Sequence, residues 1–180
     1  MIDNKAKHIL ETTFQDAISM LGMPPIPYTF CYEKMGHRFP TMDNAEEVDN
    51  VNRIVYINED WANQMVKVFA YDLYYMMAHE ARHAYQEIVI RMFQCGQSVK
   101  EPAALIVSWI DNKQHYVRNQ GGATVKPYHC QALEVDADAF ANFYVIKKQI
   151  GGARIPVDSD ELVTLRLKEI GAQYGVTIGE

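Results

Sequence analysis

Residues 71–93 read YDLYYMMAHEARHAYQEIVIRMF, and this stretch decides the fold. It contains His79-Glu80-Ala81-Arg82-His83, a match to the HExxH pattern, and it lies within a longer segment, 59–95, that has no Gly or Pro. Positions i and i+4 of a helix lie on one face about 5–6 Å apart, so both imidazoles can reach one ion at about 2.0–2.1 Å. The spacing therefore predicts a helix that presents two histidines to a single metal ion.

Glu80 is the second chemical feature of the motif. It lies about 100° around the helix from His79, beside the histidine pair, where it reaches a water molecule on the metal. We expect it to act as a general base. The surroundings favour a metal site over two exposed histidines, because ionisable side chains on a largely apolar helix need a compensating partner such as a divalent cation. The apolar residues are Leu73, Met76, Met77, Ala81, Ala84 and Ile88.

A catalytic zinc usually has three protein ligands and an open position, so a third ligand must lie elsewhere in the chain. The best candidate segment is ALEVDADAFA, residues 132–141, in which Glu134 and Asp138 are spaced i, i+4. Glu134 shares a helical stripe with apolar residues that we expect to face the core, and an inward carboxylate is unfavourable unless it is paired. An acidic first turn that suits the helix dipole is the alternative interpretation. We expect Asp136 to be solvated on a different face, and it is the fallback ligand if the register slips.

These positions resemble the gluzincin metallopeptidases, in which HExxH on one helix is followed by a Glu ligand on a later helix and an Asp one turn beyond it. The chain is also similar to small stand-alone zincin-like proteins of bacteria and their mobile elements. The resemblance covers roughly residues 50–150. It implies that zinc is bound by the two motif histidines and Glu134, and that Glu80 is the base. It also implies that Asp138 hydrogen-bonds a ligand histidine.

The implied fold is α+β and zincin-like, with a small mixed or antiparallel sheet packed on the active-site helix and further helices that carry the third ligand. The residue patterns predict a helix, a small sheet and then a series of helices. Helices are predicted over 3–22, 59–93 with a break near 69–72, 101–118, 128–149 and 158 to about 171. Strands are predicted over 26–33 and 51–58, with a possible short strand between them and a polar loop over 119–126.

The length of 180 residues predicts a single domain, 1–180. Within it we expect a helix and small sheet in 1–60, a helical zinc-binding part in 61–150 and a helical extension in 151–180. The net charge of −6 and the lack of a basic block argue against nucleic acid as a partner. No apolar run approaches the roughly 20 residues that cross a bilayer, so we expect no membrane partner.

The N-terminus lacks the pattern of a secretory signal, and the three cysteines contain no C-x-x-C pair. We therefore expect a cytoplasmic protein with buried free thiols.

The resemblance implies a zinc-dependent metallopeptidase whose partner is a peptide or protein substrate. We expect an extended substrate to add along the sheet edge at the strand around 51–57. Zincins commonly place a His or Tyr opposite the metal to stabilise the developing oxyanion, and His129 is the first choice for that role. The other candidates are His115, Tyr116 and Tyr128.

Two alternatives to a peptidase stay open. The same ligands would support a zinc hydrolase of another amide or ester. A catalytically silent zincin-fold protein would instead act as a binding or regulatory module, although such a protein has no need of a base beside the two histidines. The sequence specifies neither the substrate nor the oligomeric state.

Overall fold

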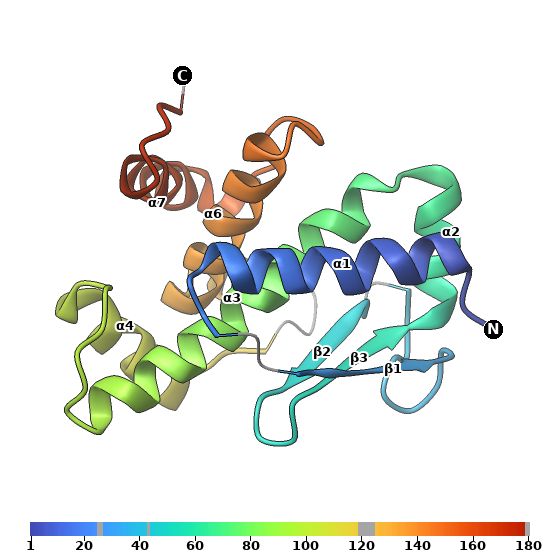
Figure 1. Cartoon of the computed structure of the whole chain (residues 1–180), viewed down its shortest axis with the longest axis horizontal. Coiled ribbons are helices and arrows are strands. Elements are labelled where there is room, and N and C mark those ends of the chain that lie inside the picture. The colour runs from blue at the N-terminus through green and yellow to red at the C-terminus, as the bar shows by residue number, and fades with distance from the viewer. Residues whose placement is uncertain (25–26, 43, 119–124, 179–180) are drawn as a thin grey trace. The chain divides into compact units, whose positions relative to one another are not determined.

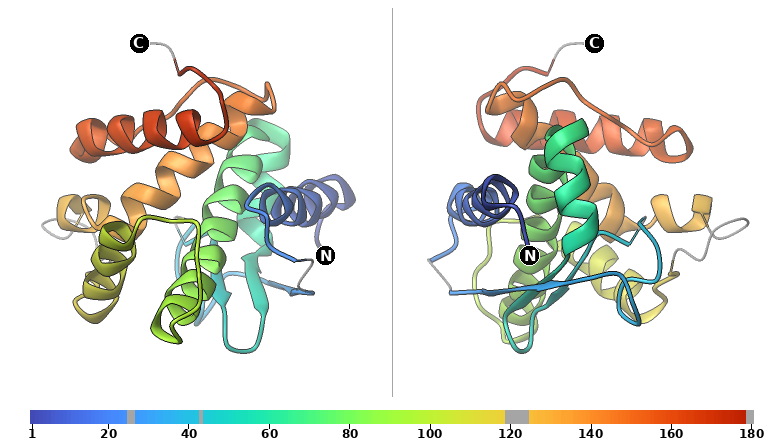
Figure 2. Two further views of the ribbon diagram at one scale, coloured as in Figure 1. Left: turned by 60° about the vertical axis from the view of Figure 1, so that its left-hand side comes forward. Right: turned by 90° about the vertical axis from the view of Figure 1, so that its right-hand side faces the viewer.

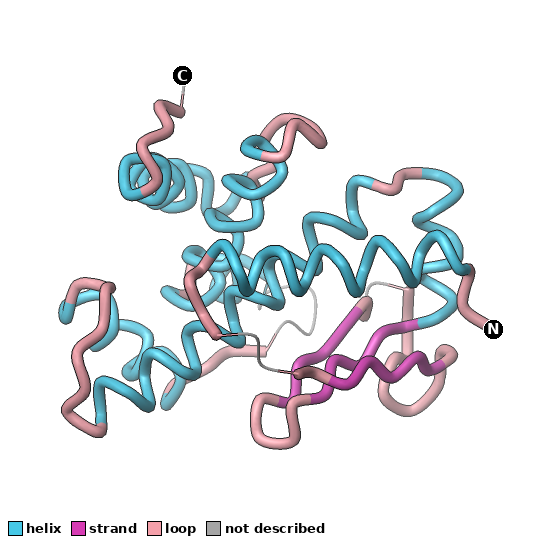
Figure 3. Tube along the Cα trace, in the orientation of Figure 1, coloured by secondary structure: helices cyan, strands magenta, loops and turns pink. Residues whose placement is uncertain are grey.

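The computed structural model describes residues 1–24, 27–42, 44–118 and 125–178. The chain divides into two compact units, Met1–Ala84 and Tyr85–Glu180, with the boundary inside helix α3 (Tyr71–Gln94). The architecture is α+β, as the sequence predicts, with seven α-helices and one three-stranded sheet among the described residues. All of the described strands belong to the first unit, and Figure 3 draws them in magenta.

The sheet of the first unit is mixed and has the strand order β1-β3-β2. Its strands are β1 (Thr29–Glu33), β2 (Glu46–Asp49) and β3 (Ile54–Asn58). β3 pairs with β1 in parallel and with β2 antiparallel. The prediction that a substrate adds along the strand around 51–57 is therefore wrong, because β3 is central and its backbone groups already pair on both sides. The strands at the sheet edges are β1 and β2.

Helix α1 (Asn4–Met20) packs on the sheet of the same unit (Figure 1). The Asp3 side chain begins the helix by accepting hydrogen bonds from the backbone amides of Lys5 at 2.8 Å and Ala6 at 3.2 Å. Phe14 makes an edge contact with Phe30 of β1, with ring centroids 5.7 Å apart. This contact places the apolar stripe of α1 against the sheet, and Phe14 is fully buried.

Two helices follow β3 in the pattern that the sequence predicts. The Asn58 side chain caps α2 (Glu59–Val68) by accepting hydrogen bonds from the amides of Asp60 and Trp61. The predicted break falls between α2 and α3, and α3 ends before Gly96, whose φ of 70° suits a glycine at a helix C-terminus. The histidine-bearing helix is therefore bounded by local signals that are visible in the sequence.

The second unit is helical in its described part. It contains α4 (Ala103–Gln114), α5 (Val125–His129), α6 (Ala132–Lys147), the 3₁₀ turn η2 (Val157–Ser159) and α7 (Asp160–Gln173). Figure 2 shows α7, in red, crossing α6, in orange. The predicted helix over 128–149 is instead two helices, because Gln131 is extended and its side chain bonds to the backbone of Val117. Of the predicted loop over 119–126, residues 119–124 lie outside the described residues and 125–126 begin α5.

No helix in the described part of the chain has both the length and the apolar character that crossing a membrane requires. The three cysteines are free, as predicted. They are not buried, however: Cys95 is exposed just beyond the end of α3, and Cys31 and Cys130 are partly exposed.

Candidate metal centre

The two motif histidines converge on one point of the first unit. The Nε2 atoms of His79 and His83 are 2.9 Å apart, and the ring centroids are 4.6 Å apart with the rings nearly perpendicular. The candidate ligand atoms of His79, Glu80 and His83 all lie within 4.8 Å of one another. Two imidazole nitrogens and a carboxylate are donors that zinc prefers, and a cation between the two rings would favour this close approach of their lone pairs. The residues present therefore fit a divalent metal ion.

The helix around this group is as apolar as its sequence indicates. Met77, Ala78 and Ala81 are fully buried, and His79 is only 6% exposed. The Tyr75 ring lies one turn before His79, with ring centroids 6.5 Å apart. An ionisable group in such surroundings is stable only with a polar or charged partner. The burial supports a metal site over a pair of solvated histidines.

A residue that the sequence does not single out, Glu46 of β2, belongs to the same neighbourhood. Both of its carboxylate oxygens are buried and have no hydrogen-bond partner among the described residues, although the residue as a whole is partly exposed. Burial raises the pKa of the Glu46 carboxyl well above its usual range, the charge of Glu80 raises this pKa further, and His79 lowers it. The sequence signal for a buried glutamate here is the adjacent pair Glu46-Glu47. Successive strand residues point to opposite faces of a sheet, so one of the two points to the covered face.

In the second unit, Glu134 faces inward from the first turn of α6, as the stripe predicts. It is only 1% exposed, and its Oε1 accepts a hydrogen bond of 2.7 Å from the Tyr116 hydroxyl. The side chain of Gln131 holds the Tyr116 segment in place, since its Oε1 accepts from the Val117 amide at 2.7 Å and its Nε2 donates to the Val117 carbonyl at 2.9 Å. Glu134 is thus a buried carboxylate with a fixed orientation within its unit.

Three of the predicted oxyanion donors lie near the Glu134 carboxylate, namely Tyr116, Tyr128 and His129. The fourth, His115, does not. The Tyr116 and Tyr128 ring centroids are 6.3 Å apart, and those of Tyr128 and His129 are 5.2 Å apart. His129 is the last residue of α5 and so does not share the helix of Glu134, contrary to the predicted span 128–149. Its Nδ1 is buried without a hydrogen-bond partner among the described residues. His115 is the exception, because its side chain is 73% exposed and stays beside Asp111 of its own helix.

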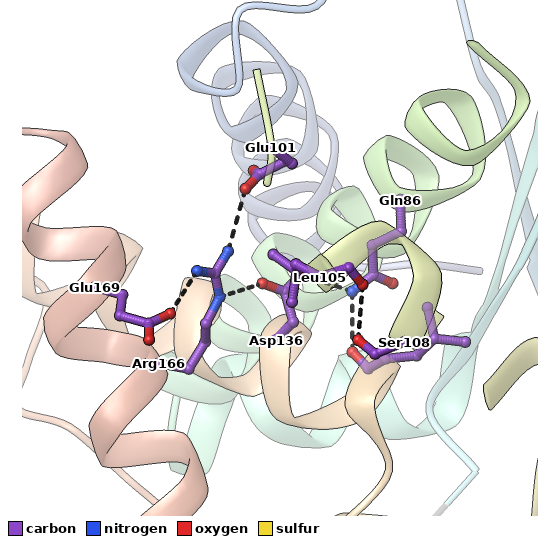
Figure 4. Close-up of polar contacts among 8 residues, drawn as sticks. Gln86, Glu101, Leu105, Ser108, Asp136, Arg166 and Glu169 are labelled. Carbon is purple, nitrogen blue, oxygen red and sulfur yellow. Dashed lines mark hydrogen bonds and ion pairs between the residues drawn. The ribbon is translucent and has the colours of Figure 1, made fainter. Parts of the chain in front are cut away.

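Asp136 does not have the solvated position that the sequence predicts. It is 1% exposed, and its Oδ1 accepts a hydrogen bond of 2.8 Å from Arg166 Nε (Figure 4). Its Oδ2 accepts one of 2.7 Å from Gln86 Nε2. The reason is that α6 is buried on nearly every face, so no solvated face exists for Asp136. Both oxygens of Asp136 are therefore bound to protein partners in a buried network.

The Arg166 guanidinium organises this buried network, as Figure 4 shows. Besides Asp136, it donates to Glu169 at 2.8 Å and to Glu101 at 3.3 Å. Arg166 and Glu101 are 6% and 8% exposed. The network joins α7 to α6 and to the segment before α4 within the second unit, and its role is structural.

The structure thus brings together His79, Glu80 and His83 in the first unit. Glu134 and Asp138 belong to the second unit, where both are buried, and their participation in the same site stays a prediction. Comparison with protein-family models, with curated proteins and with solved structures finds no match to this chain.

Proposed function

We propose that this protein is a zinc-dependent metallopeptidase similar to the gluzincins. The observation that carries the proposal is the convergence of His79 and His83 on one point of a buried helix, with Glu80 beside them. Glu134 is the proposed third ligand, supported by its burial and by the hydrogen bond from Tyr116 that orients its Oε1. When bound, zinc lowers the pKa of water toward 7 and polarises a carbonyl oxygen.

The chain's own groups perform the proton transfers. Glu80 lies next to both imidazoles, where a carboxylate accepts a proton from the attacking water and passes it to the leaving amine. His129 is the proposed donor to the negative charge that develops on the carbonyl oxygen, supported by its buried Nδ1. Tyr116 is less suited to that role, because its hydroxyl already donates to Glu134.

The test of the metal site is the zinc content of the purified protein. We expect one zinc per chain in the wild type and a loss of stoichiometric zinc in His83→Ala and in Glu134→Ala, because each variant removes one of three ligands. Native mass spectrometry of the protein after dialysis against a weak chelator measures this directly. His115→Ala is the matched control, since His115 is exposed and remote from the ligands in sequence.

Each outcome of this experiment has a defined meaning. A wild-type protein that takes up no zinc contradicts the proposed function as a whole. If His83→Ala loses zinc and Glu134→Ala retains it, the third ligand is not Glu134, and the histidine pair stands. If both variants keep full occupancy, the ligand assignment is wrong.

Asp138→Asn is expected to weaken zinc binding by about 10–100-fold without abolishing it, since a carboxylate that orients a ligand imidazole strengthens its binding. Asp138 lies one turn after Glu134 and is 6% exposed, which suits this role. Competition with a fluorescent chelator measures the affinity. Asp111→Asn is the control, because the Asp111 side chain is 77% exposed. Equal affinities in the two variants would remove Asp138 from the site.

A further inference from the structure

Glu46 lies on the covered face of the sheet. In the antiparallel pair of β2 and β3 it stands directly opposite Ile57, and residues opposite each other point to the same face. Ile57 and Val55, two residues apart on β3, are both fully buried. The strand geometry therefore directs Glu46 toward the buried side of the first unit, the side from which it interacts with His79 and Glu80 of α3.

Its neighbour Glu47 has the opposite environment. Glu47 stands opposite Tyr56 on the other face of the sheet, and its side chain is 58% exposed. It accepts a hydrogen bond of 2.8 Å from Arg38, whose guanidinium lies 3.6 Å from the centre of the Tyr56 ring. The two glutamates thus point to opposite faces of the sheet, Glu47 toward the partly exposed Arg38 and Glu46 toward the covered face.

The position of Glu46 is fixed by the backbone beside it. The Asn58 amide donates to the carbonyl of Ala45 at 2.8 Å, and the Asn58 side chain donates to the carbonyl of Asn44 at 3.0 Å. Asn58 is itself fully buried and caps α2. The start of β2 is therefore held against the end of β3, and this fixes the backbone from which the Glu46 side chain extends.

A carboxylate buried without a hydrogen-bonding or cationic partner strongly disfavours the folded state. Both oxygens of Glu46 lack a hydrogen-bond partner among the described residues, and the negative charge of Glu80 acts on this carboxylate more strongly than the positive charge of His79 does. A divalent cation at the histidine pair supplies the missing positive charge.

We propose that Glu46 is the carboxylate that the sheet contributes to the cation site of His79, Glu80 and His83. This inference rests on the proposed function, because it assumes that the site binds zinc. Glu46 is not one of the three residues whose ligand atoms all lie within 4.8 Å of one another, and we assign it a role through its charge, as a positioning residue. It makes the site more selective for a divalent ion over a monovalent one.

The experiment compares zinc affinity and folding in Glu46→Gln, Glu46→Asp and Glu47→Gln. Gln keeps the shape of the side chain and removes its charge, whereas Asp keeps the charge on a shorter chain. We expect zinc to bind about 10–100-fold more weakly to Glu46→Gln, with partial recovery in Glu46→Asp and wild-type affinity in Glu47→Gln. Chelator competition gives the affinities. The metal-free Glu46→Gln protein should melt at or above the wild-type temperature, because an unpaired buried carboxylate has been removed.

Weaker zinc binding together with an unchanged or higher melting temperature of the metal-free protein distinguishes a residue of the metal site from a structural residue. The inference is overturned if Glu46→Gln binds zinc with wild-type affinity, whatever its melting temperature in the metal-free state. In either case zinc binding by the wild type and its loss in His83→Ala would leave the proposed function standing. A wild type that binds no zinc would contradict both.

Discussion

Replacing Glu80 with Gln is expected to lower peptide hydrolysis by about 10²–10⁴-fold while zinc content and melting temperature stay at wild-type levels. The amide has the shape of the carboxylate but cannot accept the proton of the attacking water. Glu80 lies beside both histidine nitrogens, so its replacement alters the reaction and not the ligand pair. The measurement is turnover of a mixed peptide library, read by mass spectrometry, by zinc-loaded wild type and variant.

Glu87→Gln is the matched control for this prediction. It makes the same chemical change on the same helix, two turns further along, where the carboxylate accepts a hydrogen bond of 2.8 Å from Arg91. Turnover by this variant should equal that of the wild type. Unchanged turnover in Glu80→Gln would show that Glu80 is not the base, and loss of zinc from that variant would show that it is a ligand. A zinc-loaded wild type that cleaves no member of the library would contradict a peptidase and support a binding module or a hydrolase of other bonds.

Arg166→Leu is expected to destabilise the protein by about 3–5 kcal/mol, because it removes a buried cation that is bonded to two buried carboxylates. Those carboxylates are Asp136 and Glu101, which are 1% and 8% exposed. Urea unfolding, followed by circular dichroism, measures the free energy of unfolding. The candidate metal-binding group of His79, Glu80 and His83 belongs to the other unit and is not part of this network.

Arg91→Leu is the control for the loss of an arginine ion pair. Arg91 bonds to Glu87 at 2.8 Å, but its side chain is 54% exposed, and pairs of this kind contribute about 0–1 kcal/mol. A loss of stability in Arg166→Leu no larger than in Arg91→Leu would mean that the buried network is neutral to folding. The double variant Asp136→Leu, Arg166→Leu should recover part of the loss, because it removes the buried charge together with its partner.

Much of the helical pattern follows from local rules. The i, i+4 spacing places His79 and His83 together on any helix, and Gly96 ends that helix wherever it lies in the fold. The inward direction of Glu134 also follows from the apolar stripe on its own helix. The α+β class and the mixed sheet agree with the prediction, since the strand and helix periodicities of the first unit are distinct.

The sequence does not predict the break in the helix expected over 128–149. Its break at Cys130-Gln131 depends on the hydrogen bonds between the Gln131 side chain and Val117, which lies fourteen residues earlier in the chain. The local pattern contains no Gly or Pro at that point apart from Pro127, so periodicity alone continues the helix. The separation of His129 from the helix of Glu134 follows from this long-range contact.

The sequence by itself determined the histidine pair, the glutamate beside it and the apolar helix that carries them, because helix geometry depends on residues within one or two turns. Only the tertiary structure decided that β3 is central, that Glu46 stands opposite Ile57 on the covered face of the sheet and that Asp136 pairs with Arg166. Strand order, sheet register and buried ion pairs join residues far apart in the chain. Their free energies depend on burial and on the partner's position, and neither is encoded in the local spacing of residue types.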